Sequence, residues 1–458
     1  MNCLVIGAGN GSRPVARLLN HDGYDVTMTD VKDFEDFRLL HQNVLSEMEM
    51  EGVKLDLGNS SPKLSDFENI YIPPSLINSK IGDEARELDI HIINNEEFSQ
   101  IVNKYIPIDV IGISGTMGKT TTTYLTKSIF EQAGYNVWYC SSLISNLVSE
   151  CIIEGIVKGE PLKNDLAIFE LPHGTIGLLD RLNVDIGLLT NMGIDHLDEF
   201  DNSVEKYHDR KKILEMISKT FIANYSCKDT FSSKDDILYY EIGNNGDFNG
   251  EIGERSLKIR HQDNEFTTSF DMESYFFENS VAAVSIALTY GISQEDIIEA
   301  LSNFKGMPSH MEDIGMFNDR RVILDCAFLY DGMKTTLENF NDENLIVFLD
   351  YFDTTTKRDK KEVGELVGKY SDVIITSGYD EINERINMEG ALEILDAVEN
   401  PNATKVACSD IDEAAEMALK YSKPGDLLLH MGPILATDPK GITDKIIKGL
   451  KRGIEKYD

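Results

Sequence analysis

The chain has 458 residues, 41% of them apolar, so it is long enough for about two or three domains that each bury a core. Its 79 acidic residues outnumber its 43 basic ones, and the formal net charge of −36 argues against a nucleic-acid or anionic-membrane partner. No apolar run approaches the roughly 18 residues of a membrane span, the N-terminus does not resemble a signal peptide, and six cysteines without paired spacing favour the cytoplasm.

Residues 1–105 are expected to form a Rossmann-like α/β domain. A buried strand, MNCLVIGAG, leads into a glycine-rich turn and a helix, and a second strand, YDVTMTD, ends at Asp30. The segments ENIYIPPS and IHIINNEEF predict a second βαβ half. A dinucleotide site, a mononucleotide site and a purely structural turn all fit this pattern. The candidate substrate-binding residues are Gly7, Gly9, Asn10, Gly11 and Ser12 in the turn, and Asp30 roughly 20 residues further on.

The most informative segment is VIGISGTMGKTTTT, which runs from Val110 to Thr123. A run of β-branched residues enters a glycine turn, and Lys119 and several hydroxyl residues then open an amphipathic helix. Backbone N–H groups at such a helix start bind phosphate, a lysine reaches the terminal phosphates, and the hydroxyl of Thr120 can bind Mg²⁺. Ile113 stands where the general phosphate-loop pattern has its first glycine. The candidate nucleotide-binding residues are Gly115, Thr116, Met117, Gly118, Lys119, Thr120 and Thr121.

Polar side chains follow two further apolar strands. Glu170 ends the strand DLAIFEL, and the strand VDIGLLTNMG leads to Asp195 and His196. Open α/β sheets bind ligands at the carboxyl ends of their strands, so these groups offer magnesium ligands near the phosphate loop. From the residues alone, Glu170 could equally be a solvated carboxylate, and His196 a surface histidine.

The rest of the chain indicates a further parallel sheet. The strands VILDCAF, ENLIVFLDY, SDVIITS and GDLLLH alternate with helical stretches. Between Asn224 and Phe266 we expect short strands with hairpin turns around NNGDFNG and RHQDNEF. The fold class predicted is α/β with three domains: a Rossmann-like domain (1–105), a central P-loop ATPase-like parallel sheet (106–311) and a Rossmann-like C-terminal domain (312–458).

Two of the motifs resemble those of the Mur ligase superfamily, whose members use ATP to join amino acids or peptides to a carboxylate. GTMGKT is similar to the family's GTxGK[ST] loop, and TNMGIDHLD is similar to its ITNxxxDHLD motif. The resemblance implies that Glu170 and His196 hold magnesium. It also implies that Lys211, which lies in a YxxxK context, is carbamylated and binds a second Mg²⁺. Lys212 is an alternative assignment, and an ordinary solvated lysine is another.

Other matches to the family are looser. Asn279, in FENSVAAVSIAL, aligns with an asparagine that contacts adenine. His310 is the candidate substitute for an arginine that contacts the nucleotide, and Asp325, in LDCAFLYDGM, matches the aspartate of a DYAHxP-like motif. The resemblance thus adds Asn279, His310 and Asp325 to the nucleotide-binding residues.

The function that the resemblance implies is ATP-dependent formation of an amide bond. Lys119, Glu170, His196 and Lys211 would serve catalysis, with ATP and two Mg²⁺ ions. Residues 1–105 would hold a UDP-linked peptide or similar acceptor, and residues 312–458 would bind the incoming amino acid or peptide. The acidity and the departures from the family pattern favour the archaeal ligases that build pseudomurein peptide, acting as a monomer. A methanogen ligase of nickel-tetrapyrrole coenzyme synthesis, an NAD-dependent oxidoreductase and a non-catalytic nucleotide-binding scaffold are the alternatives.

Overall fold

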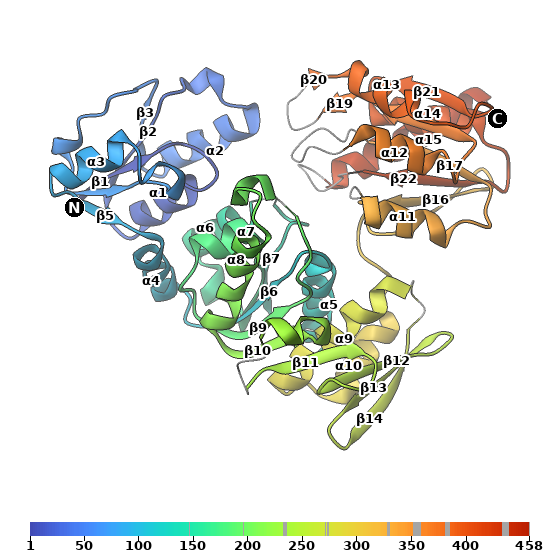
Figure 1. Cartoon of the computed structure of the whole chain (residues 1–458), viewed down its shortest axis with the longest axis horizontal. Coiled ribbons are helices and arrows are strands. Elements are labelled where there is room, and N and C mark those ends of the chain that lie inside the picture. Colours follow the sequence, from blue (N-terminus) through green and yellow to red (C-terminus); the bar gives the residue numbers. More distant parts are fainter. Residues whose placement is uncertain are drawn as a thin grey trace. The chain divides into compact units, whose positions relative to one another are not determined.

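A computed structural model describes residues 1–145, 147–195, 197–231, 236–270, 272, 274–327, 330–350, 359–380, 385–432 and 439–457 (Figure 1). Contacts divide the chain into two compact units, Met1–Phe304 and Lys305–Asp458. The first unit holds a five-stranded and a nine-stranded sheet, and the second holds a six-stranded sheet and a two-stranded ribbon. Helices alternate with strands in all three main sheets, so the predicted α/β class is confirmed. No helix of the described residues is long and apolar enough to cross a membrane.

The five-stranded sheet has the Rossmann strand order β3-β2-β1-β4-β5, with every pair parallel. The glycine turn of residues 7–12 follows β1 at the carboxyl edge of this sheet, as predicted. Its strands are β1 (Asn2–Ile6), β2 (Asp25–Asp30), β3 (Lys54–Leu57), β4 (Asn69–Tyr71) and β5 (His91–Ile93). Its helices are α1 (Arg13–His21), α2 (Leu39–Met50), α3 (Lys80–Glu87) and α4 (Asn95–Tyr105).

The nine-stranded sheet has the order β14-β13-β12-β11-β10-β9-β6-β8-β7 and is parallel from β7 to β12. Helices α5, α9 and α10 pack on one face and α6, α7 and α8 on the other. The strands are β6 (Asp109–Ser114), β7 (Val137–Cys140), β8 (Leu166–Glu170), β9 (Val184–Leu189), β10 (Ser218–Asn224), β11 (Leu238–Ile242), β12 (Phe248–Ile252), β13 (Ser256–His261) and β14 (Asn264–Ser269). The helices are α5 (Lys119–Gln132), α6 (Val148–Val157), α7 (His173–Leu178), α8 (Val204–Ile217), α9 (Ser274–Tyr290) and α10 (Gln294–Asn303).

Two hairpins were predicted between Asn224 and Phe266, and one of these predictions is wrong. The RHQDNEF segment does join the antiparallel strands β13 and β14, but the NNGDFNG segment joins β11 and β12, which run parallel. The short connection from β11 to β12 passes close to β11. Gly246 lies against the Tyr239 carbonyl oxygen, where a Cβ would be only 2.8 Å away, so this close approach favours glycine. Asp247 fixes this connection, since its backbone N–H donates to Tyr239 O at 2.7 Å.

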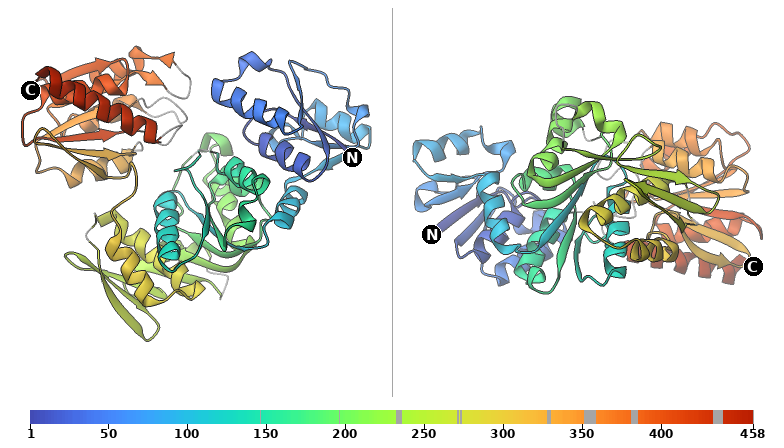
Figure 2. Two further views of the ribbon diagram at one scale, coloured as in Figure 1. Left: turned by 180° about the vertical axis from the view of Figure 1, so that it is seen from behind. Right: turned by 90° about the horizontal axis from the view of Figure 1, so that it is seen from below.

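The second unit is built on the sheet β15-β16-β22-β17-β18-β21, in which only β15 is antiparallel to its neighbour. Helices α11 to α13 cover one face, and α14 and α15 cover the other (Figure 2). The strands are β15 (Glu312–Phe317), β16 (Arg320–Asp325), β17 (Leu345–Leu349), β18 (Val373–Ser377), β21 (Thr404–Cys408) and β22 (Leu427–Met431), with β19 (Tyr379–Asp380) and β20 (Arg385–Ile386) forming the ribbon. The helices are α11 (Tyr330–Asn339), α12 (Lys360–Val367), α13 (Met388–Asp396), α14 (Ile411–Tyr421) and α15 (Pro439–Tyr457).

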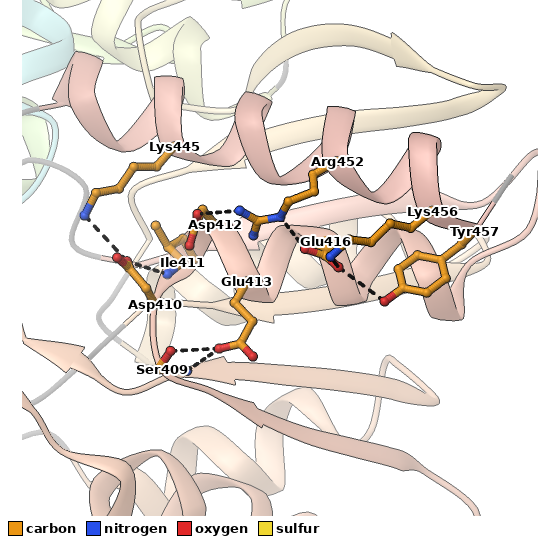
Figure 3. Close-up of polar contacts among 10 residues, drawn as sticks. All are labelled: Ser409, Asp410, Ile411, Asp412, Glu413, Glu416, Lys445, Arg452, Lys456 and Tyr457. Carbon is orange, nitrogen blue, oxygen red and sulfur yellow. Dashed lines mark hydrogen bonds and ion pairs between the residues drawn. The ribbon is translucent and has the colours of Figure 1, made fainter.

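A polar network joins α14 to α15 beside their apolar contact (Figure 3). Glu416 is only 5% exposed, and its carboxylate accepts from Arg452, from Lys456 Nζ at 2.8 Å and from the Tyr457 hydroxyl at 3.2 Å. Arg452 also donates to Asp412 at 3.0 Å. Burial opposes ionisation of Glu416, but the hydrogen bonds from Lys456 and Arg452 outweigh it and lower the pKa of the carboxyl group.

We expect Glu416→Gln to lower the free energy of unfolding of the second unit by about 1–2 kcal/mol, because Arg452 and Lys456 lose the carboxylate charge that both of them contact. Denaturant titration measures this. The matched control is Glu338→Gln on α11, where the exposed pair with Lys334 has an N–O distance of 3.8 Å and should contribute under about 0.5 kcal/mol. Equal effects of both variants would show that the network adds nothing to the docking of α15.

Candidate functional site

The phosphate loop between β6 and α5 has no room for side chains at its two glycines. Gly115 and Gly118 have φ angles of +145° and +76°. A Cβ on Gly115 would collide with the hydroxyl of Thr190, and one on Gly118 with the side-chain oxygen of Asn279. Both positions therefore require glycine for space and for backbone conformation. Asn279, on α9, is held here by a hydrogen bond of 3.3 Å from Thr122.

Helix α5 begins at Lys119, directly after Gly118. The first N–H groups of a helix lack partners within it and, with the helix dipole, attract an anion. Lys119 Nζ donates to the carbonyl oxygen of Thr116 at 2.8 Å, so its charge lies over the loop. Met117 is exposed at the tip, and the Thr121 side chain is buried under the loop. The predicted strand–loop–helix arrangement is present.

Two residues at the end of β9 brace the loop from the side. Asn191 Oδ1 accepts from the backbone N–H groups of Thr116 and Met117 at 3.1 and 3.0 Å. Its Nδ2 donates to Met117 O at 3.0 Å, and Thr190 Oγ1 donates to the same oxygen at 2.5 Å. The Thr-Asn pair of the TNMGIDHLD motif therefore fixes the conformation of the phosphate loop.

Glu170 forms a small oxygen cluster with two hydroxyl groups. Its side chain is 2% exposed, and Oε2 accepts from Ser142 N–H at 3.0 Å and Ser142 Oγ at 2.9 Å. Ser142 Oγ also lies 2.9 Å from Thr120 Oγ1. Oε1 accepts no hydrogen bond from any described residue. A buried carboxylate oxygen beside a threonine hydroxyl and the phosphate loop fits a hard cation such as Mg²⁺.

Sequence reasoning missed Ser142, which lies in the segment after β7. The strand order places β7 beside β8 and so brings Ser142 to Glu170. The only signal in the sequence is a pair of serines, Ser141 and Ser142, at the end of an apolar strand. Among the described residues, no group of three or more His, Cys, Asp and Glu side chains could hold a metal ion. A site here would therefore depend on other ligand types, such as Thr120.

Lys211 is a buried amine beneath the phosphate loop. It lies on α8, is 1% exposed, donates to the carbonyl oxygen of Gly115 and has Nζ 4.7 Å from the centre of the Tyr207 ring. Burial and the positive charge of Lys119 lower its pKa to about 6, against a smaller opposing effect of Asp195. The amine is therefore largely neutral at pH 7. Lys212 is part-exposed and pairs with Asp209 at 2.9 Å, so the geometry favours Lys211 over Lys212.

His196, the other predicted metal ligand, lies outside the described residues. Its neighbour Gly193 is described, and the carbonyl oxygen of Gly193 contacts His208 Nε2 at 3.1 Å. The structure thus brings together Lys119, Thr120, Glu170, Lys211 and Asn279 around the phosphate loop, and the role of His196 stays a prediction.

Two of the predicted nucleotide-binding residues belong to the second unit. Asp325 ends β16 and is 7% exposed; its carboxylate accepts from Met311 N–H at 3.2 Å and from the Thr336 hydroxyl. Burial raises the pKa of Asp325 to about 6. His310 contacts Cys326 Sγ through Nε2 and Pro308 O through Nδ1, both at 3.0 Å. Burial lowers the pKa of His310 to about 4, so the imidazole is neutral, and as the candidate substitute for the family's arginine it would bring no positive charge.

The glycine turn after β1 is held by its own residues. Asp30 accepts from Ala8 N–H at 2.7 Å and from Lys32 N–H at 3.0 Å, one bond to each carboxylate oxygen. The Ser12 hydroxyl is buried and donates to Ile6 O at 2.8 Å. Both side chains therefore hold the backbone of the turn. Each carboxylate oxygen of Asp30 has a further lone pair, so the ribose contact of Asp30 stays a prediction. The exposed part of the turn is its tip, Gly9, Asn10 and Gly11.

The side chain of His41, on α2, lies within the influence of several cations. Burial and the charges of Arg13, Arg38 and Lys32 together lower the pKa of His41 to about 4. Three cations therefore lie within electrostatic range of His41, of which Arg13 is buried and paired with Glu150.

Two long segments of the chain match known protein families. Residues 113–288 match the Mur ligase middle domain, and residues 311–434 match the Mur ligase glutamate ligase domain. An uncharacterized protein of Methanothermobacter thermautotrophicus is 39% identical over 209 residues, which cover 44% of this chain and 65% of that protein. The chain therefore matches just under two thirds of the length of this relative.

Two further proteins match more of the chain. The UDP-N-acetylmuramoyl-L-alanyl-D-glutamate–2,6-diaminopimelate ligase of Caldanaerobacter subterraneus is 27% identical over 356 residues, 71% of this chain and 73% of that protein. A pseudomurein peptide ligase type C from Methanothermus fervidus superposes with a TM-score of 0.58 at 22% identity and covers 99% of both chains. The structural match supports the fold.

We expect Gly118→Ala to weaken binding of Mg²⁺-ADP at least about tenfold, because the new Cβ displaces Asn279 or the loop itself. Isothermal calorimetry measures the affinity. The matched control is Gly134→Ala, at a φ of +90° with no atom near the added Cβ. Both variants should lose about 1 kcal/mol of stability to backbone strain. Unchanged nucleotide affinity in Gly118→Ala would contradict the tight fit described for this loop.

Proposed function

Since the chain belongs to the Mur ligase family, we propose that it is an ATP-dependent carboxylate–amine ligase that extends a UDP-linked peptide precursor of a cell wall. The observation that carries the proposal is the group around the phosphate loop: Lys119, the Glu170–Ser142–Thr120 cluster and the buried amine of Lys211. These residues supply a phosphate cradle, oxygen ligands for a metal and a neutral amine, all at the carboxyl edge of one sheet.

In the first step an oxygen of the acceptor carboxylate attacks the γ-phosphorus of ATP. The bond from γ-phosphorus to the bridging oxygen breaks, ADP leaves, and an acyl phosphate forms. The N-terminus of α5 and Lys119 hold the phosphates and stabilise the charge that moves onto the leaving oxygen. In the second step the incoming amine attacks the acyl carbon, phosphate leaves, and loss of a proton from nitrogen gives the amide. The protein acts mainly by positioning both reactants and excluding water.

Magnesium, when bound, would neutralise the charge of the triphosphate and align it for transfer. Thr120 and Glu170 would hold one ion, with His196 as a further predicted ligand. Lys211 would serve a second ion as its carbamate: the neutral amine adds to CO₂, a C–N bond forms, and one proton is released. Its lowered pKa and its contact with Gly115 O support this role, because only an unprotonated amine is nucleophilic.

The acceptor would bind at the five-stranded sheet, within residues 1–105. The exposed tip of the glycine turn and the cations Lys32 and Arg38 suit an anionic group such as a diphosphate. The diaminopimelate ligase of Caldanaerobacter subterraneus is named for a UDP-linked peptide substrate, which supports this acceptor class. Similarity over the whole chain to a pseudomurein peptide ligase favours pseudomurein as the cell-wall polymer.

The remaining predicted residues would contact the nucleotide or lie in the unit that binds the incoming amine. Asn279 lies against Gly118 and would contact the base or ribose end of ATP. Residues 312–458 would bind the incoming amino acid or peptide, and Asp325, with both oxygens engaged, would shape that unit at the carboxyl end of β16. This division at residues 106 and 312 follows the predicted domain boundaries.

We expect Lys119→Ala to abolish ATP-dependent phosphate release, with a fall of at least about 100-fold, because the charge of the transferred phosphoryl group loses its cation. Phosphate release is measured against a panel of uridine nucleotides, nucleotide-linked peptides and amino acids, which also identifies the substrates. Lys127→Ala, two turns further along α5, is the control and should retain activity. Full turnover by Lys119→Ala, or no release by the wild type with any acceptor, would overturn the proposed reaction.

We expect Lys211→Ala to lose phosphate release and to recover part of it when a short-chain carboxylic acid is added, because the acid replaces the carbamate. Wild-type activity should depend on dissolved CO₂ above about pH 6, where the amine is unprotonated. Lys212→Ala is the matched control and should behave as the wild type in both assays. Normal activity of Lys211→Ala without added acid would exclude the carbamate.

A further inference from the structure

Arg13 connects the glycine turn to the nine-stranded sheet. It is the first residue of α1 and is 1% exposed. Nη1 donates to Ala8 O at 3.0 Å and Nη2 to Asn10 Oδ1 at 2.9 Å, so two of its donors hold the turn. Nε donates to Glu150 Oε1 at 2.6 Å. The Arg13 guanidinium thus donates hydrogen bonds both to the glycine turn and to a carboxylate of α6.

Glu150 lies close in sequence to the magnesium-site cluster. It stands in the first turn of α6, and the segment before this helix, residues 141–147, begins with Ser141 and Ser142. Ser142 binds Glu170 and Thr120, as described above. The chain is tightly turned here, since Ser141 O accepts from the N–H groups of Ile144 and Ser145 at 3.0 and 3.1 Å. Ser145 Oγ in turn accepts from Leu147 N–H at 3.2 Å, directly before α6, so hydrogen bonds connect this turn to the start of the helix.

The Arg13–Glu150 pair is held together by burial. Its side chains are 1% and 16% exposed, and it is the one ion pair of Arg13 among the described residues. Burial raises the pKa of Glu150, and Arg13 is the main opposing influence. Separating the two groups would take from the Glu150 carboxylate its main counter-charge and leave the buried Arg13 with only neutral partners, Ala8 and Asn10. The pair therefore joins α1 to α6 by a contact that is costly to break.

Other contacts hold the two sheets together without touching either loop. Asn103 on α4 donates to Arg181 O at 2.8 Å and accepts from Asn183 N–H at 2.9 Å. Asn95, also on α4, donates to Gly177 O at 2.8 Å. The interface thus has its own hydrogen bonds, and the Arg13–Glu150 pair differs from them because it ends on the glycine turn.

We propose that Arg13 and Glu150 are positioning residues that couple the glycine turn to the Glu170–Ser142–Thr120 cluster, so that nucleotide binding at one orders the acceptor-binding turn at the other. This inference rests on the proposed function, in which the cluster receives Mg²⁺-ATP and the turn receives the acceptor. Coupling of this kind is reciprocal, so acceptor binding would equally tighten the cluster.

The test uses the full chain and Mg²⁺-ADP as the probe. Hydrogen exchange of the amides of residues 7–12 is followed with and without the probe, and its affinity is measured by calorimetry. In the wild type the probe should slow exchange in the turn. Arg13→Met and Glu150→Gln should each abolish this slowing and weaken the binding of Mg²⁺-ADP about tenfold. The double variant should bind Mg²⁺-ADP no more weakly than either single variant. ADP without Mg²⁺ should bind all variants equally, because the effect passes through the metal cluster.

Asn103→Ala is the matched control, because it removes two hydrogen bonds across the same interface and should keep the slowing. Glu150→Gln retains the shape of its side chain and decides the question if Arg13→Met does not fold. Preserved slowing in Glu150→Gln, or equal loss in Asn103→Ala, would overturn the coupling while leaving the proposed function intact. A wild type that does not bind Mg²⁺-ADP at all would overturn the proposed function and the coupling with it.

Discussion

The central sheet depends on one close approach, that of the phosphate loop to the ends of its neighbouring strands. Gly115 meets Thr190 and Gly118 meets Asn279 at distances that no side chain allows. This contact lets Asn191 satisfy the loop's backbone groups, and it brings the Gly115 carbonyl oxygen within reach of Lys211. The shape of the loop and the chemistry of the buried amine therefore have the same origin. Loosening the loop would restore water to Lys211 and with it a positive charge.

The charge distribution gives the same site a second constraint. A chain with a net charge of −36 repels triphosphates and diphosphates over most of its surface. The cation of the phosphate loop is instead fixed in place by a short contact, that of Lys119 Nζ with Thr116 O. Local geometry, and not overall charge, selects for phosphate here.

Much of this site could be predicted from the sequence because its signals are local. The glycine spacing around Lys119 and the apolar strands ending in Glu170 and Asn191 each lie within a few residues. Ser142 and the Arg13–Glu150 pair could not be predicted, since they depend on which strands and helices become neighbours. The parallel pairing of β11 and β12 was missed for a related reason, because the turn residues of NNGDFNG suit a hairpin equally well. For Asp30 the local pattern predicted a ligand contact, and the structure adds a role that the pattern did not show, since the carboxylate accepts from the backbone N–H groups of Ala8 and Lys32.

That occupation of Asp30 bears on how such a chain evolves. An acid that recognised a sugar would tie the fold to one class of metabolite, and changing the metabolite would mean losing the acid. Asp30 also maintains the backbone of the turn, so it is needed whatever the turn binds, and the fully exposed residues of the turn are Gly9, Asn10 and Gly11. New specificities could therefore arise by drift at this tip, while the scaffold beneath is inherited unchanged.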